Sequence, residues 1–107
     1  MSAHLTTHIL DAASGAPASG MGVALATLEG EQIDRGVTDA DGRLALGPET
    51  LVPGDYAVVF NTGSYFEAKD VEAFYPVVTV TFTVSNSSHY HVPLLLSPFS
   101  YSTYRGS

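Results

Sequence analysis

Three histidines and one arginine are the side chains of this sequence best suited to chemistry. His8 lies near the start of the chain, and His89 and His91 are separated by a single residue. A neutral imidazole with a pKa of about 6.5 is a suitable base near neutral pH. Arg43 carries a planar guanidinium, which suits an anionic or carbonyl-rich ligand beside a cleft. These side chains supply a base and an anion-binding group, provided that the fold brings them together.

The alternation of side chains along two expected strands places two of these histidines on outer faces. Apolar residues recur at every second position over residues 90–96 and predict a core face, so His91 points the other way. In the expected strand over residues 5–11, His8 points out of the sheet if Ile9 points in. His8 and His91 therefore converge on one outer face if the two strands are close. The alternative interpretation is two ordinary exposed histidines.

Two metal-binding interpretations start from the same part of the sequence. His89 and His91 have the spacing of two ligands on one strand, and His8 is a possible third ligand of an open zinc site. Residues 39–42 read Asp-Ala-Asp-Gly, which is similar to the start of a calcium loop, but the remaining ligand positions are missing. No nearby carboxylate is an obvious partner for the histidines. We therefore expect no bound metal, and a tight hairpin turn ahead of Arg43.

The composition limits the class of protein. The chain has 107 residues, of which 45% are hydrophobic and 14% charged, which predicts one folded domain over residues 1–107. A net charge of −7 excludes a nucleic-acid binder and disfavours an anionic membrane surface. The lack of cysteine excludes disulfides and thiolate catalysis. No apolar run approaches the roughly 20 residues of a membrane span, and the first residues do not resemble a signal peptide, so we expect a cytoplasmic protein.

Short apolar and β-branched segments separated by Gly, Pro, Asp and Asn predict an all-β sandwich or barrel. The segment 64–72 breaks this pattern, and its loosely helical spacing predicts one short helix. The last residues, 100–107, contain two tyrosines and an arginine, whereas chain ends usually fray and carry small polar residues. We therefore expect a docked tail that brings a terminal carboxylate with it. The expected strands cover residues 5–11, 21–29, 32–38, 44–46, 54–61, 77–84, 89–97 and 99–104.

Four segments, in this order, resemble the motifs of the 5-hydroxyisourate hydrolases in the transthyretin-like family. They are residues 5–18 (Leu-Thr-Thr-His-Ile-Leu-Asp, then Gly-x-Pro-Ala), 38–43 (Thr-x-x-Asp-Gly-Arg), 89–98 (His-Tyr-His-Val-Pro-Leu-Leu-Leu-Ser-Pro) and 104–107 (Tyr-Arg-Gly-Ser). The similarity covers essentially the whole chain. Transthyretin, the hormone carrier, shares the fold but lacks the histidine motifs and the Tyr-Arg-Gly-Ser ending. The mild departures, Tyr75 and Ser100, touch no proposed catalytic group.

This resemblance implies a transthyretin-like two-sheet β-sandwich of about eight strands with one short helix. It implies a homotetramer, a dimer of dimers, with active sites at the dimer–dimer interface and with no cofactor or metal. The implied reaction opens the lactam ring of 5-hydroxyisourate to 2-oxo-4-hydroxy-4-carboxy-5-ureidoimidazoline in urate degradation. The residues implied as catalytic are His8, Arg43, His91 and Ser107. The residues implied to bind substrate are His8, Arg43, His91, Tyr104, Arg105, Gly106 and Ser107.

For the implied reaction we expect water to attack a carbonyl without a covalent intermediate. One of His8 and His91 deprotonates this water, and the other orients it or protonates the leaving nitrogen; the assignment stays open, as does any part played by His89. We expect Arg43 to stabilise the developing negative charge. We expect Ser107 to fix a histidine tautomer or order the water. The alternatives are a non-catalytic transthyretin-like small-ligand carrier, a secreted β-sandwich module, and a metal-dependent hydrolase that uses the three histidines.

Overall fold

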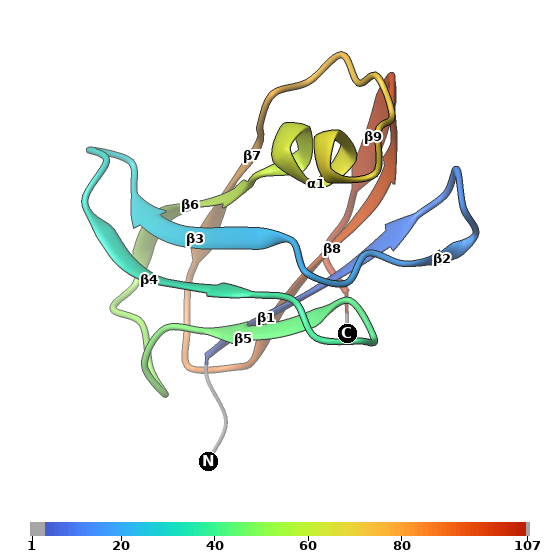
Figure 1. Ribbon diagram of the computed structural model, residues 1–107. Coiled ribbons are helices and arrows are strands. Elements are labelled where there is room, and N and C mark those ends of the chain that lie inside the picture. The colour runs from blue at the N-terminus through green and yellow to red at the C-terminus, as the bar shows by residue number, and fades with distance from the viewer. Residues whose placement is uncertain (1–3, 107) are drawn as a thin grey trace.

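The computed structural model describes residues 4–106, and within this range the chain forms nine strands and one helix (Figure 1). Eight of the strands coincide with the expected segments to within a few residues, and the additional strand, β2, lies in what the sequence indicated to be a connector. The elements are β1 (Leu5–Asp11), β2 (Ala16–Pro17), β3 (Gly22–Thr27), β4 (Gln32–Val37), β5 (Arg43–Leu46), β6 (Gly54–Phe60), α1 (Thr62–Ala68), β7 (Val78–Val84), β8 (Tyr90–Ser97) and β9 (Ser100–Thr103).

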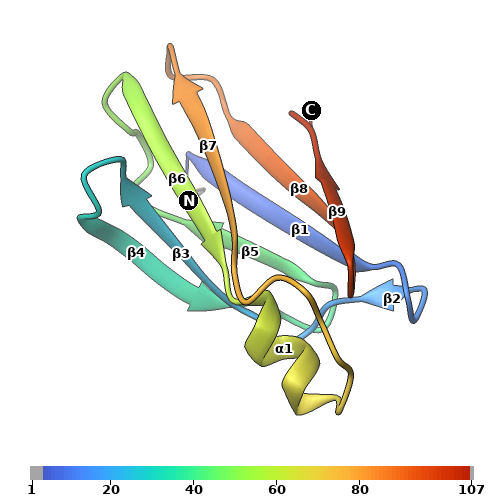
Figure 2. The ribbon, with the colours of Figure 1, turned by 90° about the horizontal axis from the view of Figure 1, so that it is seen from above.

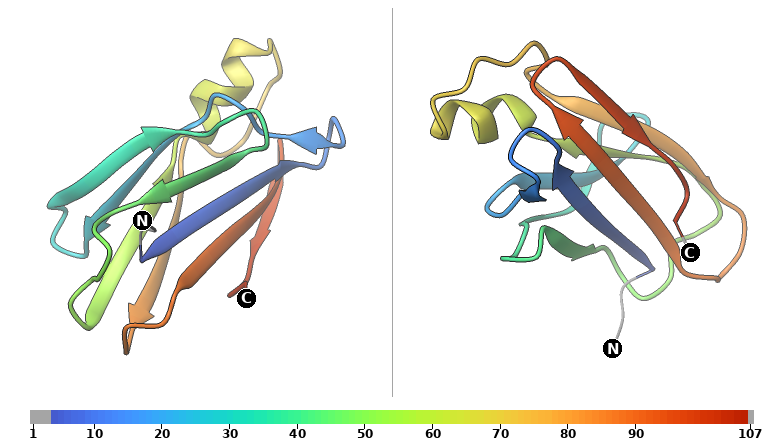
Figure 3. Two further views of the ribbon diagram at one scale, coloured as in Figure 1. Left: turned by 90° about the horizontal axis from the view of Figure 1, so that it is seen from below. Right: turned by 90° about the vertical axis from the view of Figure 1, so that its right-hand side faces the viewer.

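The strands form two sheets that face each other, with α1 at one end of the sandwich (Figure 2). One sheet has the order β4-β3-β6-β7 and is antiparallel throughout. In the other sheet β1 is central, because it pairs in parallel with β8 on one side and antiparallel with β5 and β2 on the other. Figure 3 shows β5, β1, β8 and β9 side by side. This arrangement brings the start of the chain against its last long strand.

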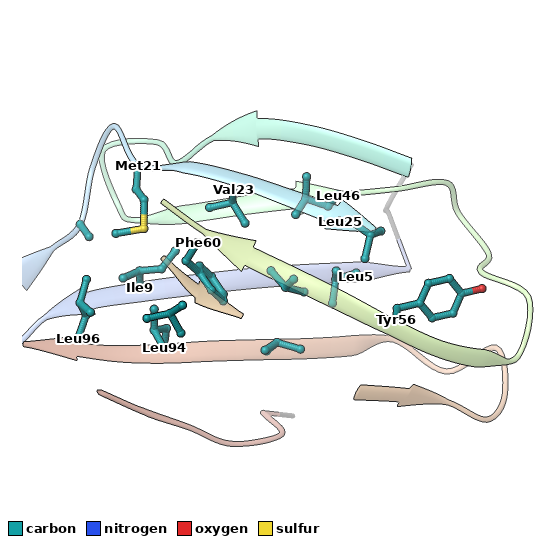
Figure 4. Packing of buried hydrophobic residues seen from close by; sticks show 14 of the residues in the cluster. Leu5, Ile9, Met21, Val23, Leu25, Leu46, Tyr56, Phe60, Leu94 and Leu96 are labelled. Atoms are coloured by element: carbon teal, nitrogen blue, oxygen red, sulfur yellow. The ribbon is translucent and has the colours of Figure 1, made fainter. Parts of the chain in front are cut away.

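The core lies between the two sheets and is built from side chains at alternate positions along the strands, which point inward (Figure 4). Along β1 the burial alternates strictly: Leu5, Thr7, Ile9 and Asp11 are buried, and Thr6, His8 and Leu10 are half-buried. Burial of one apolar side chain such as Leu5 contributes about 1.5–3 kcal/mol. The predicted core face of β8 is confirmed, because Tyr90, Val92, Leu94 and Leu96 are all buried. His8 and His91 therefore point to the outer face, as the alternation predicted.

The helix begins and ends earlier than the predicted range of residues 64–72. Its first turn is held by the end of the following loop, where the Thr62 hydroxyl donates to the Tyr75 carbonyl and Gly63 N–H donates to that of Pro76. It ends at Ala68 because Asp70 adopts a left-handed backbone with φ of 58°. The apolar spacing that continued past Ala68 belongs to a loop. No helix within residues 4–106 has the length and apolar character needed to cross a membrane.

Candidate active site

The outer face of the β5-β1-β8 part of the sheet brings together three of the predicted site residues. His8 is the cross-strand partner of Arg43 in the antiparallel β1–β5 pair. On the other side of β1, Thr6 is the partner of His91 in the parallel β1–β8 pair. Directly opposite residues lie on the same face of a sheet. The expected convergence of His8 and His91 is therefore confirmed, and Arg43 joins them from a third strand.

The turn before β5 determines where Arg43 lies. Gly42 has φ of 73°, a left-handed conformation that favours glycine. Its carbonyl accepts a hydrogen bond from Ile9 N–H at 2.9 Å, and a Cβ added to it would lie 2.5 Å from the Ile9 carbonyl oxygen. Only a glycine fits this close approach to β1. The turn is thereby held against β1, and the next residue, Arg43, is placed beside His8.

Asp39 completes this turn as an anion. Its Oδ1 accepts hydrogen bonds from the backbone N–H groups of Arg43 and Asp41, both at 2.9 Å. The hydrogen bond from the Arg43 N–H is the largest cause that holds the pKa of Asp39 below its usual value. Partial desolvation raises this pKa, but the Asp41 N–H and the charges of Arg43 and His8 lower it further. The expected tight turn is confirmed. Within residues 4–106 no three His, Cys, Asp or Glu side chains are grouped to hold a metal ion.

A hollow of about 460 Å³ opens on this face. His91, His89, Arg43 and Asp39 supply its charged and ionisable groups, whereas His8 lies beside it, next to Arg43. A larger hollow of about 700 Å³ lies beside α1, but none of the predicted site residues lines it. The larger hollow lacks the predicted catalytic side chains, so we assign the site to the smaller hollow, which contains Arg43 and His91. The complete lining is Thr6, Thr7, Asp39, Arg43, Leu44, Ala45, His89 and His91.

His91 is held in its neutral form at neutral pH by its surroundings. It is half-buried, and desolvation is the largest cause that lowers the pKa of His91 below its usual value. The positive charge of Arg43 lowers it further, with smaller contributions from His8 and His89, while a hydrogen bond with the Thr6 backbone acts in the opposite direction. Neutral imidazole has a lone pair and can accept a proton. His91 is thus suited to act as a base beside a guanidinium.

The expected docking of the tail is confirmed for Arg105 and Gly106. Gly106 N–H donates to the His91 carbonyl at 2.9 Å, and the Arg105 guanidinium lies over the Tyr90 ring, 4.5 Å from its centroid. Tyr104 and Arg105 line a separate hollow of about 300 Å³, to which His91 also contributes. The tail therefore reaches His91 from the side opposite Arg43's strand. The predicted site residue Ser107 lies outside the described residues.

Two residues with a direct part in the site's geometry were not singled out from the sequence. Thr6 lies two residues before His8 on the same face, and its hydroxyl contacts the rings of both His89 and His91 at 2.8 Å. His4 is 2% exposed; its ring contacts the Ser88 carbonyl and accepts a hydrogen bond from Leu51 N–H, so it holds the segment just before His89. Alternation along the first strand was the available signal for Thr6; nothing in the sequence pointed to His4.

The architecture is that of a transthyretin-like β-sandwich. The crystal structure of sea bream transthyretin in complex with thyroxine matches with a TM-score of 0.86 and 35% identity, covering 95% of this chain and 93% of that chain. The structure of Klebsiella pneumoniae 5-hydroxyisourate hydrolase matches with a TM-score of 0.87 and 39% identity, covering 96% of this chain and 92% of that chain. The predicted fold class is confirmed.

The model of the HIUase/Transthyretin family matches residues 5–106. The chain therefore belongs to the HIUase/Transthyretin family. The curated 5-hydroxyisourate hydrolase of Salmonella dublin is 50% identical over 109 residues, which cover 96% of this chain and 80% of that protein. With enzyme relatives at this identity and coverage, the chain is a hydrolase.

Proposed function

We propose that this protein hydrolyses 5-hydroxyisourate to 2-oxo-4-hydroxy-4-carboxy-5-ureidoimidazoline in urate degradation. The observation that carries the proposal is the grouping of His8, Arg43 and His91 on one outer face, from three strands that are neighbours only in the fold. The similarity to enzymes of that name, including the Salmonella dublin and Klebsiella pneumoniae proteins, supports the same substrate. The hollow of about 460 Å³ is large enough for a small bicyclic molecule.

In the proposed mechanism, His91 takes a proton from a water molecule, and the resulting hydroxide attacks the ring carbonyl. The electron pair of the C=O bond moves to oxygen, and Arg43 stabilises that negative charge. The C–N bond then breaks, the nitrogen takes up the proton, and the acyl carbon is left as a carboxylic acid that ionises. His8, beside Arg43, orients the water or the leaving nitrogen. Tyr104, Arg105, Gly106 and Ser107 are proposed to border the substrate at His91.

We propose that the active assembly is a homotetramer, a dimer of dimers, with the site at the dimer–dimer interface. The outer face that carries the site also carries apolar side chains. Leu95 is 40% exposed, and its partner across the β1–β8 pair, Leu10, is half-buried. Apolar groups beside a polar site are typical of a face that a second copy covers. A covered face excludes water around His91, and the lower dielectric constant strengthens the electrostatic effect of the Arg43 charge on the His91 ring.

The test of the proposed function is an ultraviolet time course. Urate oxidase and urate generate 5-hydroxyisourate in place, and the untagged protein is added with and without a chelator, after its mass has been measured by light scattering. We expect a tetramer that accelerates loss of the intermediate's absorbance equally in both samples. Acceleration abolished by the chelator supports the metal-dependent alternative. No acceleration by a folded tetramer contradicts the proposal and favours the carrier.

The pH dependence of the reaction follows from the lowered pKa of His91. A base works only when unprotonated, so kcat/KM is expected to stay level through neutral pH and to fall below about pH 6.5, as His91 becomes protonated. Arg43→Ala removes a positive charge that opposes the imidazolium, so the acid limb of that variant should move to higher pH. The measurement is kcat/KM over the range from about pH 5 to about pH 8. An acid limb centred above the ordinary histidine value argues against His91 as the base.

Gly106→Ala is expected to lower kcat about tenfold or more, because it displaces His91. A Cβ added at Gly106 would lie 2.4 Å from His91 Cδ2, so either the ring or the tail must shift. The matched control is Ser102→Ala on the exposed strand β9. Steady-state kinetics and thermal unfolding of both variants make the check. A Gly106→Ala enzyme with the activity of the control shows that the tail does not position His91.

A further inference from the structure

The Thr6 hydroxyl lies between two histidine rings. Thr6 Oγ1 is 2.8 Å from His91 Nδ1 and 2.8 Å from His89 Nε2, both within hydrogen-bond distance. All three side chains line the hollow that also contains Arg43. With Nδ1 of His91 engaged by Thr6, Nε2 is the nitrogen left for the water and substrate.

A hydroxyl group couples the protonation of the two rings. It has one proton to donate and lone pairs to accept with, so Thr6 donates to one ring and accepts from the other. When His91 carries its proton on Nδ1 and donates to Thr6, Thr6 donates to an unprotonated Nε2 of His89. When Thr6 donates to Nδ1 of His91, His89 donates from a protonated Nε2. The first arrangement leaves Nε2 of His91 free to act as a base.

The two rings differ in how well they tolerate a positive charge. His91 is half-buried, and desolvation lowers its pKa. The charged or titratable groups around it are Arg43 on β5 with Asp39 before it, His8 on β1 and His89 just before β8; Arg105 lines the adjacent hollow on the side of the tail. The charges of Arg43, His8 and His89 disfavour an imidazolium at His91. His89 is the more exposed of the two rings, so a positive charge there is less desolvated than at His91.

We propose that Thr6 is a proton relay between His91 and His89: when His91 takes a proton from the attacking water, transfers through the Thr6 hydroxyl move the resulting positive charge from the half-buried ring to the exposed ring. The inference deepens the proposed hydrolysis and rests on it. Thr6 is a positioning residue, because it acts through His91 and not on the substrate. It also gives His89 a part in the reaction as the temporary proton acceptor.

The proton transfers balance. Nε2 of His91 takes a proton from water, Nδ1–H of His91 passes its proton to Thr6 Oγ1, and the original Thr6 proton passes to Nε2 of His89. The result is a hydroxide that attacks the carbonyl, a neutral His91 with its proton on Nε2, and an imidazolium at His89. When the C–N bond breaks, the same transfers run backwards. His91 then donates the Nε2 proton to the leaving nitrogen, and His89 returns to its neutral form.

The kinetic test compares Thr6→Val, which keeps the shape and removes the hydroxyl, with Thr6→Ser, which keeps the hydroxyl. We expect Thr6→Val to lower kcat about 10- to 100-fold with KM within about twofold, and Thr6→Ser to stay within about threefold of the parent. His89→Gln should lower kcat to a similar extent. The double variant Thr6→Val/His89→Gln should be no slower than Thr6→Val, because Thr6→Val already stops the transfer and the second substitution has nothing further to remove. Multiplicative losses in the double variant, or a fully active Thr6→Val, overturn the relay.

A second measurement does not depend on the substrate and so separates the relay from the proposed function. Histidine ¹⁵N NMR reports which ring nitrogen carries the proton and follows the titration of each ring. We expect His91 to be protonated on Nδ1 and its titration to be coupled to that of His89 in the parent and in Thr6→Ser. In Thr6→Val the two rings should titrate independently. Independent titration in the parent overturns the inference even if the hydrolysis is confirmed, whereas coupled rings without hydrolysis contradict only the proposed function.

Discussion

Arg43→Ala is expected to lower kcat/KM for 5-hydroxyisourate by about 10²–10³-fold, or about 3–4 kcal/mol of transition-state stabilisation. Arg43 is the guanidinium of the hollow that contains His91, and the Gly42 turn holds its backbone against β1. The turn therefore places the start of the Arg43 side chain beside His8 before the substrate binds. An interaction that strengthens as the oxyanion forms acts mainly on kcat. The loss should accordingly appear in kcat more than in KM.

The matched control for this variant is Arg35→Ala. Arg35 is exposed on β4, in the other sheet and away from the hollow. It should keep the activity of the parent, and both variants should keep the thermal midpoint and the assembly mass. Arg43→Lys keeps a charge but loses the planar fork, so we expect an intermediate loss. An Arg43→Ala enzyme as active as Arg35→Ala removes Arg43 from the mechanism, and loss of the assembly in Arg43→Ala alone makes its role structural.

His91→Asn is expected to lower kcat by about 10²–10⁴-fold, which is the usual contribution of a general base. The asparagine side chain is short and polar, and it keeps a hydrogen-bonding group near the position of Nδ1, where Thr6 can bind it. It has no nitrogen that accepts a proton near neutral pH. We therefore expect a folded enzyme without its base, and added imidazole should restore part of the rate. Steady-state kinetics with and without imidazole make the measurement.

His8→Asn, studied in parallel, assigns the roles of the two histidines. If His91 is the base, the acid limb of the pH profile disappears with His91→Asn and remains in His8→Asn. The opposite result exchanges the two roles without changing the proposed reaction. An equal, small effect of both substitutions contradicts general base catalysis by either ring. Thermal unfolding checks the fold, and we expect midpoints within about 4 °C of the parent, because both side chains lie on the outer face.

The sequence spacing of His89 and His91 is that of two metal ligands, but in the tertiary structure the two rings share a contact with a hydroxyl group. Both rings turn toward the Thr6 hydroxyl rather than toward a shared third ligand. A metal ion binds a ring nitrogen that has no other partner. Here Nδ1 of His91 and Nε2 of His89 both contact the Thr6 hydroxyl. A spacing of two on one strand specifies that two rings share a face. It does not specify which nitrogen of each ring is free, because that depends on the side chain opposite.

The sequence by itself determined which way the site residues point. Alternating burial has a period of two, so one buried residue in each strand was enough to place His8 and His91 on outer faces. The Asp-Ala-Asp-Gly turn was also readable, because Gly42 needs a left-handed backbone that few other residues adopt. The helix bounds were wrong in the sequence interpretation. The hydrogen bonds that begin the helix come from the loop after it, and that contact is not local.

Only the tertiary structure decided which of these faces meet. The parallel pairing of β1 with β8 places Thr6 opposite His91, and the antiparallel pairing with β5 places His8 opposite Arg43. No local pattern encodes such register over this separation, because the pairing depends on how both sheets close around one core. The approach of Gly106 to His91 has the same origin. The residue types of the site were thus local information, whereas their distances followed from the way the first strand inserts between two strands that come later in the chain.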